Sequence, residues 1–147
     1  MTEFLNTYGT YILFIGGITI IGIIVTIINY KKMKNNVADF LTKNPNAAKI
    51  CLTTKAFITS EAVTVHTVNG ETPILFSEKG KTGVYAIPGD IEIEMSYSYT
   101  RPGVMYKTVT TSTDVVKKNL QVEENKTYIL GFDRKKQQFT FEELEEK

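Results

Sequence analysis

The chain has 147 residues, a net charge of +1 and a single cysteine, Cys51. Residues 31–55 are basic and the C-terminal end is acidic, but neither block is long enough to favour nucleic-acid binding. One cysteine excludes an internal disulfide. After the apolar N-terminal region about 105 residues remain, which suits one domain that buries a core without disulfides or metals.

Residues 8–30 form an apolar run without a charged side chain. As a helix with a rise of ~1.5 Å per residue, the run is roughly 35 Å long and crosses a hydrocarbon core of ~30 Å. The short N-terminus, residues 1–7, has Glu3 but no Lys or Arg, and no small-residue cleavage site follows the run. These features favour an uncleaved transmembrane helix over a secretory signal. A buried core helix is the other alternative, but so small a domain would not enclose this run.

A basic cluster directly follows the apolar run, formed by Lys31, Lys32 and Lys34. Positive residues next to a span stay on the cytoplasmic side, where they meet anionic lipid headgroups at the membrane surface. The cluster therefore predicts a single-pass protein of the cell membrane, with its N-terminus outside and its C-terminal domain in the cytoplasm.

One face of the predicted span carries small and hydroxyl-bearing residues at steps of three or four. Small residues let a second helix approach closely, and Thr and Asn can hydrogen-bond across the contact. The stripe predicts association with a partner helix or a second copy, although Gly17 lies off it and glycine is common in membrane helices. Its central members are Gly16, Thr19, Gly22 and Thr26, extended by Gly9, Ile12 and Asn29.

The helical pattern continues beyond the span. Met33, Val37 and Phe40 keep a helical apolar spacing, so residues 31–45 are expected to form a basic juxtamembrane helical stalk. Pro45 ends this helix, because the residue before a proline is pushed out of the α region.

Residues 46–142 are rich in Thr, Val, Ile, Tyr and Phe, in short runs separated by turn residues. This pattern predicts an all-β domain, an antiparallel β-sandwich with an Ig-like fold or a small barrel as alternatives, followed by an acidic tail at 143–147. The expected strands are 49–58, 62–68, 73–77, 83–87, 90–100, 104–115, 118–123, 127–133 and 137–142.

Two turns and one strand are the clearest local predictions. Asn69-Gly70 predicts a two-residue hairpin between the second and third strands, and residues 133–136 close the last hairpin. Residues 90–100 alternate strictly, so one face of that strand is expected in the core and the other in water. Ile91, Met95 and their alternate neighbours form the core face.

The order of these elements resembles small bacterial β-sandwich modules of the PEGA type. An Asn-Gly turn is followed by Tyr85-Ala-Ile-Pro-Gly89, an alternating strand and a later strand that begins Lys126-Thr-Tyr128. The resemblance covers roughly residues 62–132, and Ile87-Pro88-Gly89-Asp90 stands where the family has its namesake tetrapeptide. The resemblance implies an accessory or binding role without catalysis.

His66 and Cys51 are the residues best suited to metal or nucleophilic chemistry. Zinc needs three or four ligands, and a Cys–His nucleophilic pair needs a third, orienting group. Two scattered residues fall short of both, so we expect His66 to be an ordinary strand residue. No catalytic, metal or cofactor site is predicted.

Asp90, Glu92 and Glu94 form an acidic ladder on one strand face. A flat strand does not wrap a calcium ion, so the ladder is expected to be a solvated face that pairs with Lys107 or Lys81. A set of tyrosines could line a sugar or peptide groove, although core edges are the more common place for them. The set consists of Tyr85, Tyr97, Tyr99, Tyr106 and Tyr128.

The sequence thus predicts a non-enzymatic, membrane-anchored interaction module, such as an accessory subunit of a membrane protein complex. Its expected partners are the lipid bilayer and another protein, or a second copy bound through the span. A tethered domain that binds a small ligand, a carbohydrate or a lipid headgroup is the alternative. An enzyme is disfavoured, since the sequence has neither a P-loop, nor a dinucleotide glycine fingerprint, nor a Gly-x-Ser-x-Gly motif.

Overall fold

The computed structural model describes residues 2–56, 59–78, 80–103 and 107–144, with the backbone alone at 2–10, 12 and 13. The chain divides into two compact units, Met1–Ala38 and Asp39–Lys147. The first unit contains most of one long helix, and the second contains a β-rich domain of two five-stranded sheets.

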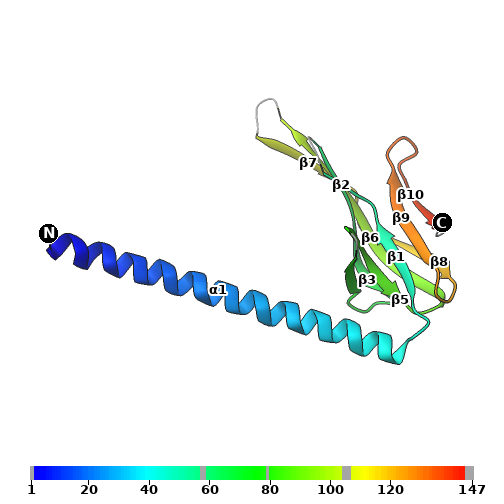
Figure 1. Ribbon diagram of the computed structural model, residues 1–147. Helices are drawn as coiled ribbons and strands as arrows, with labels where there is room; N and C mark the ends of the chain where they lie inside the picture. Colours follow the sequence, from blue (N-terminus) through cyan, green and yellow to red (C-terminus); the bar gives the residue numbers. More distant parts are fainter. Residues whose placement is uncertain (1, 57–58, 79, 104–106, 145–147) are drawn as a thin grey trace. The chain divides into compact units, whose positions relative to one another are not determined.

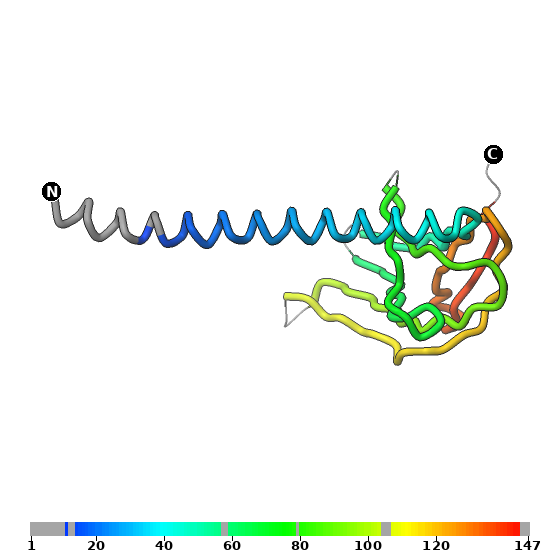
Figure 2. Tube along the Cα trace, turned by 90° about the horizontal axis from the view of Figure 1, so that it is seen from below, coloured from blue at the N-terminus to red at the C-terminus, as the bar shows by residue number. Residues whose placement is uncertain are grey.

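The helix α1 spans Thr2–Lys43 without interruption (Figures 1 and 2). It therefore includes the predicted span, the described part of the segment before it, and most of the expected stalk. Asn44 ends the helix by donating both its backbone N–H and its side-chain amide to the carbonyl of Phe40, at 2.8 and 3.1 Å. Pro45 follows, as the sequence predicts.

The ten strands form two sheets, named here sheet A and sheet B (Figure 1). In sheet A the order is β10-β9-β1-β5-β4, and in sheet B it is β2-β3-β6 with β7 and β8 both pairing with the other edge of β6. The strands of sheet A are β1 (Ala48–Leu52), β4 (Ile74–Glu78), β5 (Lys81–Ala86), β9 (Thr127–Asp133) and β10 (Gln138–Glu143). The strands of sheet B are β2 (Thr54–Ala56), β3 (Ser60–Val68), β6 (Gly89–Pro102), β7 (Thr108–Ser112) and β8 (Val116–Val122).

One pair of strands departs from the predicted antiparallel arrangement. β1 and β9 are parallel, with Lys49 opposite Thr127 and Leu52 opposite Leu130. The two strands are separated in the chain by all of sheet B, so no hairpin fixes their relative direction. The last two strands form the antiparallel hairpin that the sequence predicts, and they lie side by side as the orange and red segments of Figure 2.

The predicted strand 49–58 is divided at Thr53, and its residues 57–58 lie outside the described part. β1 belongs to sheet A and β2 to sheet B. Thr53 bonds to both sheets, since its N–H donates to Leu130 at 2.9 Å and its carbonyl accepts from Val63 at 3.3 Å. A continuous β-prone run therefore crosses from one layer of the domain to the other.

The Asn69-Gly70 turn forms, but the hairpin predicted from it does not. Both residues have positive φ, 53° and 75°, as a type I′ turn requires, and Val68 and Glu71 exchange backbone hydrogen bonds of 3.0 Å. Beyond this bridge the strands separate, with β3 in sheet B and β4 in sheet A. Pro73 has no N–H to continue the ladder, and it precedes the start of β4.

β7 and β8 run along the same edge of β6 and are separated by an irregular segment at 113–115. Ser112 lies opposite Ser98 and Val116 opposite Met95, so this edge has one residue more than β6 over the same stretch. Such an insertion is a β-bulge. The hairpin of β6 and β7 extends away from β9 and β10 in both views (Figures 1 and 2), and residues 104–106 of the predicted strand 104–115 lie outside the described part.

The core forms between the inner faces of the two sheets. The alternation predicted for β6 is confirmed, because Ile91, Met95 and the alternate residues between Ile91 and Tyr97 are buried while Asp90 and Glu92 are exposed. The largest fully buried side chains are Ile50, Ile93, Met95, Leu130, Val84 and Val122.

Candidate functional site

The surface of α1 is apolar and exposed. Within its described part, Phe14–Lys43 is long and apolar enough to cross a membrane, and none of the most apolar window is buried. Phe14 and Ile21, for example, are 71% and 62% exposed. Exposed apolar area of this extent is typical of a segment that another apolar phase covers, so the helix fits a membrane anchor or a signal sequence.

The stripe of small residues is open along α1. A methyl group added to Gly16, Gly17 or Gly22 would meet no atom within 4 Å. The hydroxyls of Thr19 and Thr26 donate to carbonyls one turn earlier, at 2.8 Å, so each is satisfied inside the helix. Helix packing through this stripe stays a prediction, and Gly9 and Ile12 are described by their backbone alone.

The basic cluster Lys31, Lys32 and Lys34 belongs to the same helix and is exposed. A charged segment thus follows the apolar one without a change of backbone conformation. Contact of these lysines with a membrane surface stays a prediction.

The outer face of sheet A, which points away from the core, carries a compact polar and aromatic cluster. Lys49 lies 2.7 Å from the Glu78 carboxylate, and the hydroxyl of Tyr85 donates to the same carboxylate at 3.1 Å. The ammonium of Lys49 also lies over the rings of Phe76 and Tyr85, 5.7 and 5.9 Å from their centroids. Burial, and then the bond to Glu78, raises the pKa of Tyr85. The cluster binds β1, β4 and β5 together on this face.

A hollow, named here the β4 hollow, lies beside Tyr85 where β4 begins. Its volume is about 60 Å³, far below the ~300 Å³ or more of a typical ligand pocket, so it admits one small side chain rather than a sugar. Phe40, from the last turn of α1, packs its ring 6.2 Å from that of Tyr85 at one wall. The lining residues are mostly apolar and include Phe40, Val68, Pro73, Ile74, Tyr85 and Ile87, with Glu71 among the polar ones.

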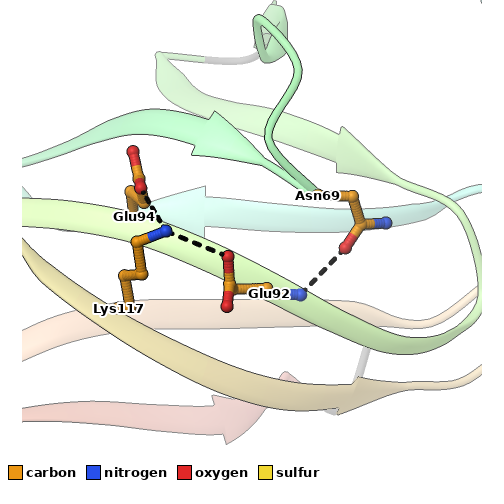
Figure 3. Close-up of polar contacts among 4 residues, drawn as sticks. All are labelled: Asn69, Glu92, Glu94 and Lys117. Atoms are coloured by element: carbon orange, nitrogen blue, oxygen red, sulfur yellow. Dashed lines mark hydrogen bonds and ion pairs between the residues drawn. The ribbon is translucent and has the colours of Figure 1, made fainter.

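The exposed face of sheet B contains the acidic ladder, of which Figure 3 shows Glu92 and Glu94. The partner expected for it is wrong: neither Lys81 nor Lys107 but Lys117 pairs with it, 2.8 Å from Glu94 and 3.4 Å from Glu92. The register of β8 places Lys117 directly opposite Glu94, which lowers the pKa of that carboxyl through the hydrogen bond from the lysine. Glu92 and Glu94 of the ladder are thus ion-paired on the side of β6 that faces away from the core.

The same face holds the Asn69-Gly70 turn against β6 (Figure 3). Asn69 donates its N–H to the carbonyl of Glu92 at 2.7 Å, and its side-chain oxygen accepts from the N–H of Glu92 at 2.9 Å. Asn69 therefore makes the hydrogen bonds to β6 that a paired strand residue would make. These bonds fix the path of the chain from β3 toward β4.

Cys51 and His66 are not brought together, since Cys51 lies in β1 of sheet A and His66 in β3 of sheet B. Cys51 is buried, and this burial raises the pKa of its thiol. The exposed His66 sits at a break in the strand register and bonds Ser96 at 2.8 Å, a contact that sequence reasoning missed. Alternation placed Ser96 on the wet face, but only the register of β3 against β6 brings the two together. Among the described residues, no group of three or more His, Cys, Asp or Glu could hold a metal.

The described tyrosines of the set do not lie together. Tyr97 stacks on Phe132 and Tyr128 on Phe141, with centroids 4.3 and 4.7 Å apart, and both tyrosines are buried in the core. Tyr85 lies on the outer face of sheet A, and Tyr106 lies outside the described residues.

Arg134 connects the two sheets at the end of β9. Its guanidinium lies 3.9 Å from the ring centroid of Tyr99 and 3.2 Å from the carboxylate of Glu61, so a turn of sheet A is held against β6 and β3. Beside it, the buried hydroxyl of Tyr97 has no hydrogen-bond partner within the described part of the chain. Burial and the nearby Glu61 raise the pKa of Tyr97. The contacts of Arg134 with Tyr99 and Glu61 thus link the two sheets.

The domain also has apolar side chains exposed at two sites on its surface. Leu75 and Ile87 lie at or near the start of β4, and Val115 and Val116 lie where β8 begins. No protein family, curated protein or solved structure matches the chain.

Proposed function

We propose that the protein is a single-span membrane protein whose β domain binds a protein partner, as a non-enzymatic accessory subunit of a membrane complex. The exposure of α1 on all sides is the observation that carries the proposal. Ile15, Ile18, Ile20, Ile21 and Ile23 are all at least half exposed, and at 100° per residue they are distributed around the helix. Lipid covers a helix on all sides, whereas a groove in another protein would cover only one face. A helix that is apolar on all sides therefore fits a lipid environment better.

The charges next to the span support a cytoplasmic domain. Lys31, Lys32 and Lys34 are exposed on the C-terminal side of the apolar segment, and such residues resist translocation. They support an orientation with the N-terminus outside and sheets A and B in the cytoplasm.

The β domain supports partner binding more than ligand binding. The β4 hollow is small and the described tyrosines are dispersed, whereas Leu75, Ile87 and Val115 expose about half of their surface. The PEGA-type resemblance, which stays a prediction, implies the same accessory role.

Membrane integration is expected to survive carbonate washing. The apolar segment has no charged side chain to favour water, so the full-length chain should stay in the membrane pellet, with the mass of the intact protein. Release of a shorter form that begins near residue 30 would identify α1 as a cleaved signal and refute the anchor.

The side of the membrane on which the β domain lies can be tested by proteolysis. Protease added to intact cells should leave the domain uncut, and permeabilised cells should lose it. Replacing Lys31, Lys32 and Lys34 by Glu should expose the domain to external protease in a fraction of the molecules. Digestion of the unmodified protein from outside would overturn the cytoplasmic assignment.

Association through the span is expected to depend on Gly22. Gly22→Ile adds apolar bulk to the stripe, so it should preserve insertion but reduce disulfide-independent crosslinking to a partner helix or a second copy several-fold. Gly17→Ile adds the same bulk off the stripe and serves as the matched control. Equal crosslinking of the two variants would mean that the stripe is ordinary glycine content, and that a partner is held by the β domain.

A further inference from the structure

We propose that Asn69 is a site of spontaneous deamidation, and that the isoaspartate formed there detaches the Asn69-Gly70 turn from β6. The turn combines a backbone nitrogen that the fold leaves free with a side-chain amide that the fold uses as a hydrogen-bond acceptor. The reaction concerns the β domain alone, so it does not depend on whether α1 anchors the chain or on which partner the domain binds.

The nucleophile of the reaction is the backbone nitrogen of Gly70. Asn69 and Gly70 are both exposed, so water and hydroxide reach the turn. Within the described part of the chain the N–H of Gly70 has no hydrogen-bond acceptor, whereas the N–H groups of Val68, Asn69 and Glu71 are all bonded. Gly70 has no Cβ, and one added there would meet no atom within 4 Å, so the space around this residue is open. Asparagine is among the thermolabile side chains, and a following glycine leaves its Cγ accessible to attack.

The chemistry needs only water. Hydroxide removes the proton of the Gly70 N–H, and the nitrogen attacks Cγ of Asn69 to form a new C–N bond. The bond from Cγ to the side-chain nitrogen breaks, ammonia leaves with a proton from water, and hydroxide is regenerated beside a five-membered succinimide. One water then opens the ring. Cleavage of the new C–N bond gives aspartate, and cleavage of the original peptide bond gives isoaspartate, whose main chain is longer by one methylene group.

The folded turn restrains the first step. Asn69 has a φ of 53°, in the left-handed region, where ψ is typically about +47°. In that conformation the Cβ of a residue and the nitrogen of the next one lie on opposite sides of the Cα–C bond, but the succinimide ring requires them on the same side. The backbone of Asn69 must therefore rotate before the attack. Rotation breaks its two hydrogen bonds to Glu92, of 2.7 and 2.9 Å, so the reaction proceeds from a locally opened turn.

The two products differ in whether the turn can dock again. Aspartate keeps an oxygen where the Asn69 amide oxygen was, so it can accept the N–H of Glu92 as before (Figure 3). Isoaspartate adds a methylene group to a two-residue turn whose ends, Val68 and Glu71, exchange hydrogen bonds of 3.0 Å. A type I′ turn of fixed length sets that pairing, so the longer chain cannot keep both ends in register. The isoaspartate form therefore loses the bonds that direct the chain from β3 toward β4.

The site is tested with the full chain in lipid nanodiscs, incubated in mildly alkaline buffer and mapped by peptide mass spectrometry. Asn125 is the matched internal control, because it is also exposed and has a φ of 57°, but Lys126 follows it. Deamidation at Asn69 should be about tenfold faster than at Asn125, a difference of ~1.4 kcal/mol in barrier. A synthetic peptide of residues 66–73 should react faster than the folded chain, because no bond to Glu92 restrains it. Equal rates at the two asparagines, or a folded chain as fast as the peptide, would overturn the proposal.

The structural consequence is tested on the isoaspartate form, separated by chromatography and identified by labelling with an isoaspartyl methyltransferase. Its amides at Val68, Asn69 and Glu71 should exchange hydrogen about tenfold faster than in the unmodified chain, since their acceptors are lost. The amides of β9 should keep their protection, which shows that the domain stays folded. Asn69→Asp carries the same added charge without the methylene group, and its exchange should stay close to that of the unmodified chain. Unchanged exchange in the isoaspartate form, or an equal gain in Asn69→Asp, would show that a longer main chain does not release the turn.

Discussion

Met95→Asp is expected to abolish folding of the β domain. Met95 lies on the inner face of β6 and is fully buried between the sheets, 0% exposed. A carboxylate there has no cation to pair with in the core, whose residues are apolar or aromatic. An uncompensated buried charge costs about 4 kcal/mol or more, a large part of the ~5–15 kcal/mol that stabilises a typical domain. A fragment of residues 39–147, the second compact unit, should lose its cooperative urea transition in circular dichroism.

Glu92→Lys is the control on the same strand. Glu92 is on the wet face of β6, its side chain is 46% exposed, and its contact with Lys117 is 3.4 Å long. The change should alter the free energy of unfolding by less than ~1 kcal/mol, since exposed ion pairs contribute little. Comparable damage from both substitutions would show that the two faces of β6 are wrongly assigned.

Gly83→Ala is expected to be the most damaging single-methyl change in sheet A. The added Cβ would meet the backbone carbonyl of Ile50, and it would lie 2.6 Å from the ring of Phe76, which covers this glycine. The carbonyl belongs to the pairing of β1 with β5 and cannot rotate away, so the strands must separate. Overpacking against a rigid neighbour should reduce the free energy of unfolding by about 3 kcal/mol, measured by urea denaturation of the same fragment.

Gly131→Ala is the matched change in β9. Its added Cβ would lie 2.9 Å from the hydroxyl of Thr140 and 3.2 Å from that of Thr53, and both are side-chain atoms that can turn aside. We expect a loss of about 1 kcal/mol. If Gly131→Ala were the more damaging of the two, backbone contact at Gly83 would not be what requires glycine there.

Short sequence patterns were enough to predict the features that depend only on residues close together in the chain. The uncharged run 8–30 required a long apolar helix, and α1 contains it. Strict alternation assigned the two faces of β6, because successive side chains of a strand point to opposite sides. Asn69-Gly70 gave the type I′ turn, because both residues tolerate positive φ.

Only the tertiary structure decided which strands are neighbours. The run 49–58 carries no signal that it changes sheets at Thr53, since the crossing is made by hydrogen bonds to Leu130 and Val63, distant in sequence. Likewise, Lys117 rather than Lys81 pairs with Glu94 because of the register between β6 and β8. Pairings of this kind depend on which loops close, and periodicity within one strand does not contain that information.

The same division holds for the proposed sites. The apolar helix and its basic flank could be recognised from the sequence, because a bilayer acts on each residue of a helix in the same way whatever the rest of the fold. The docking of the Asn69-Gly70 turn on β6 could not, because its hydrogen bonds to Glu92 join residues distant in sequence. The β4 hollow likewise exists only where Phe40, the turn at Asn69 and the end of β5 meet in the folded domain.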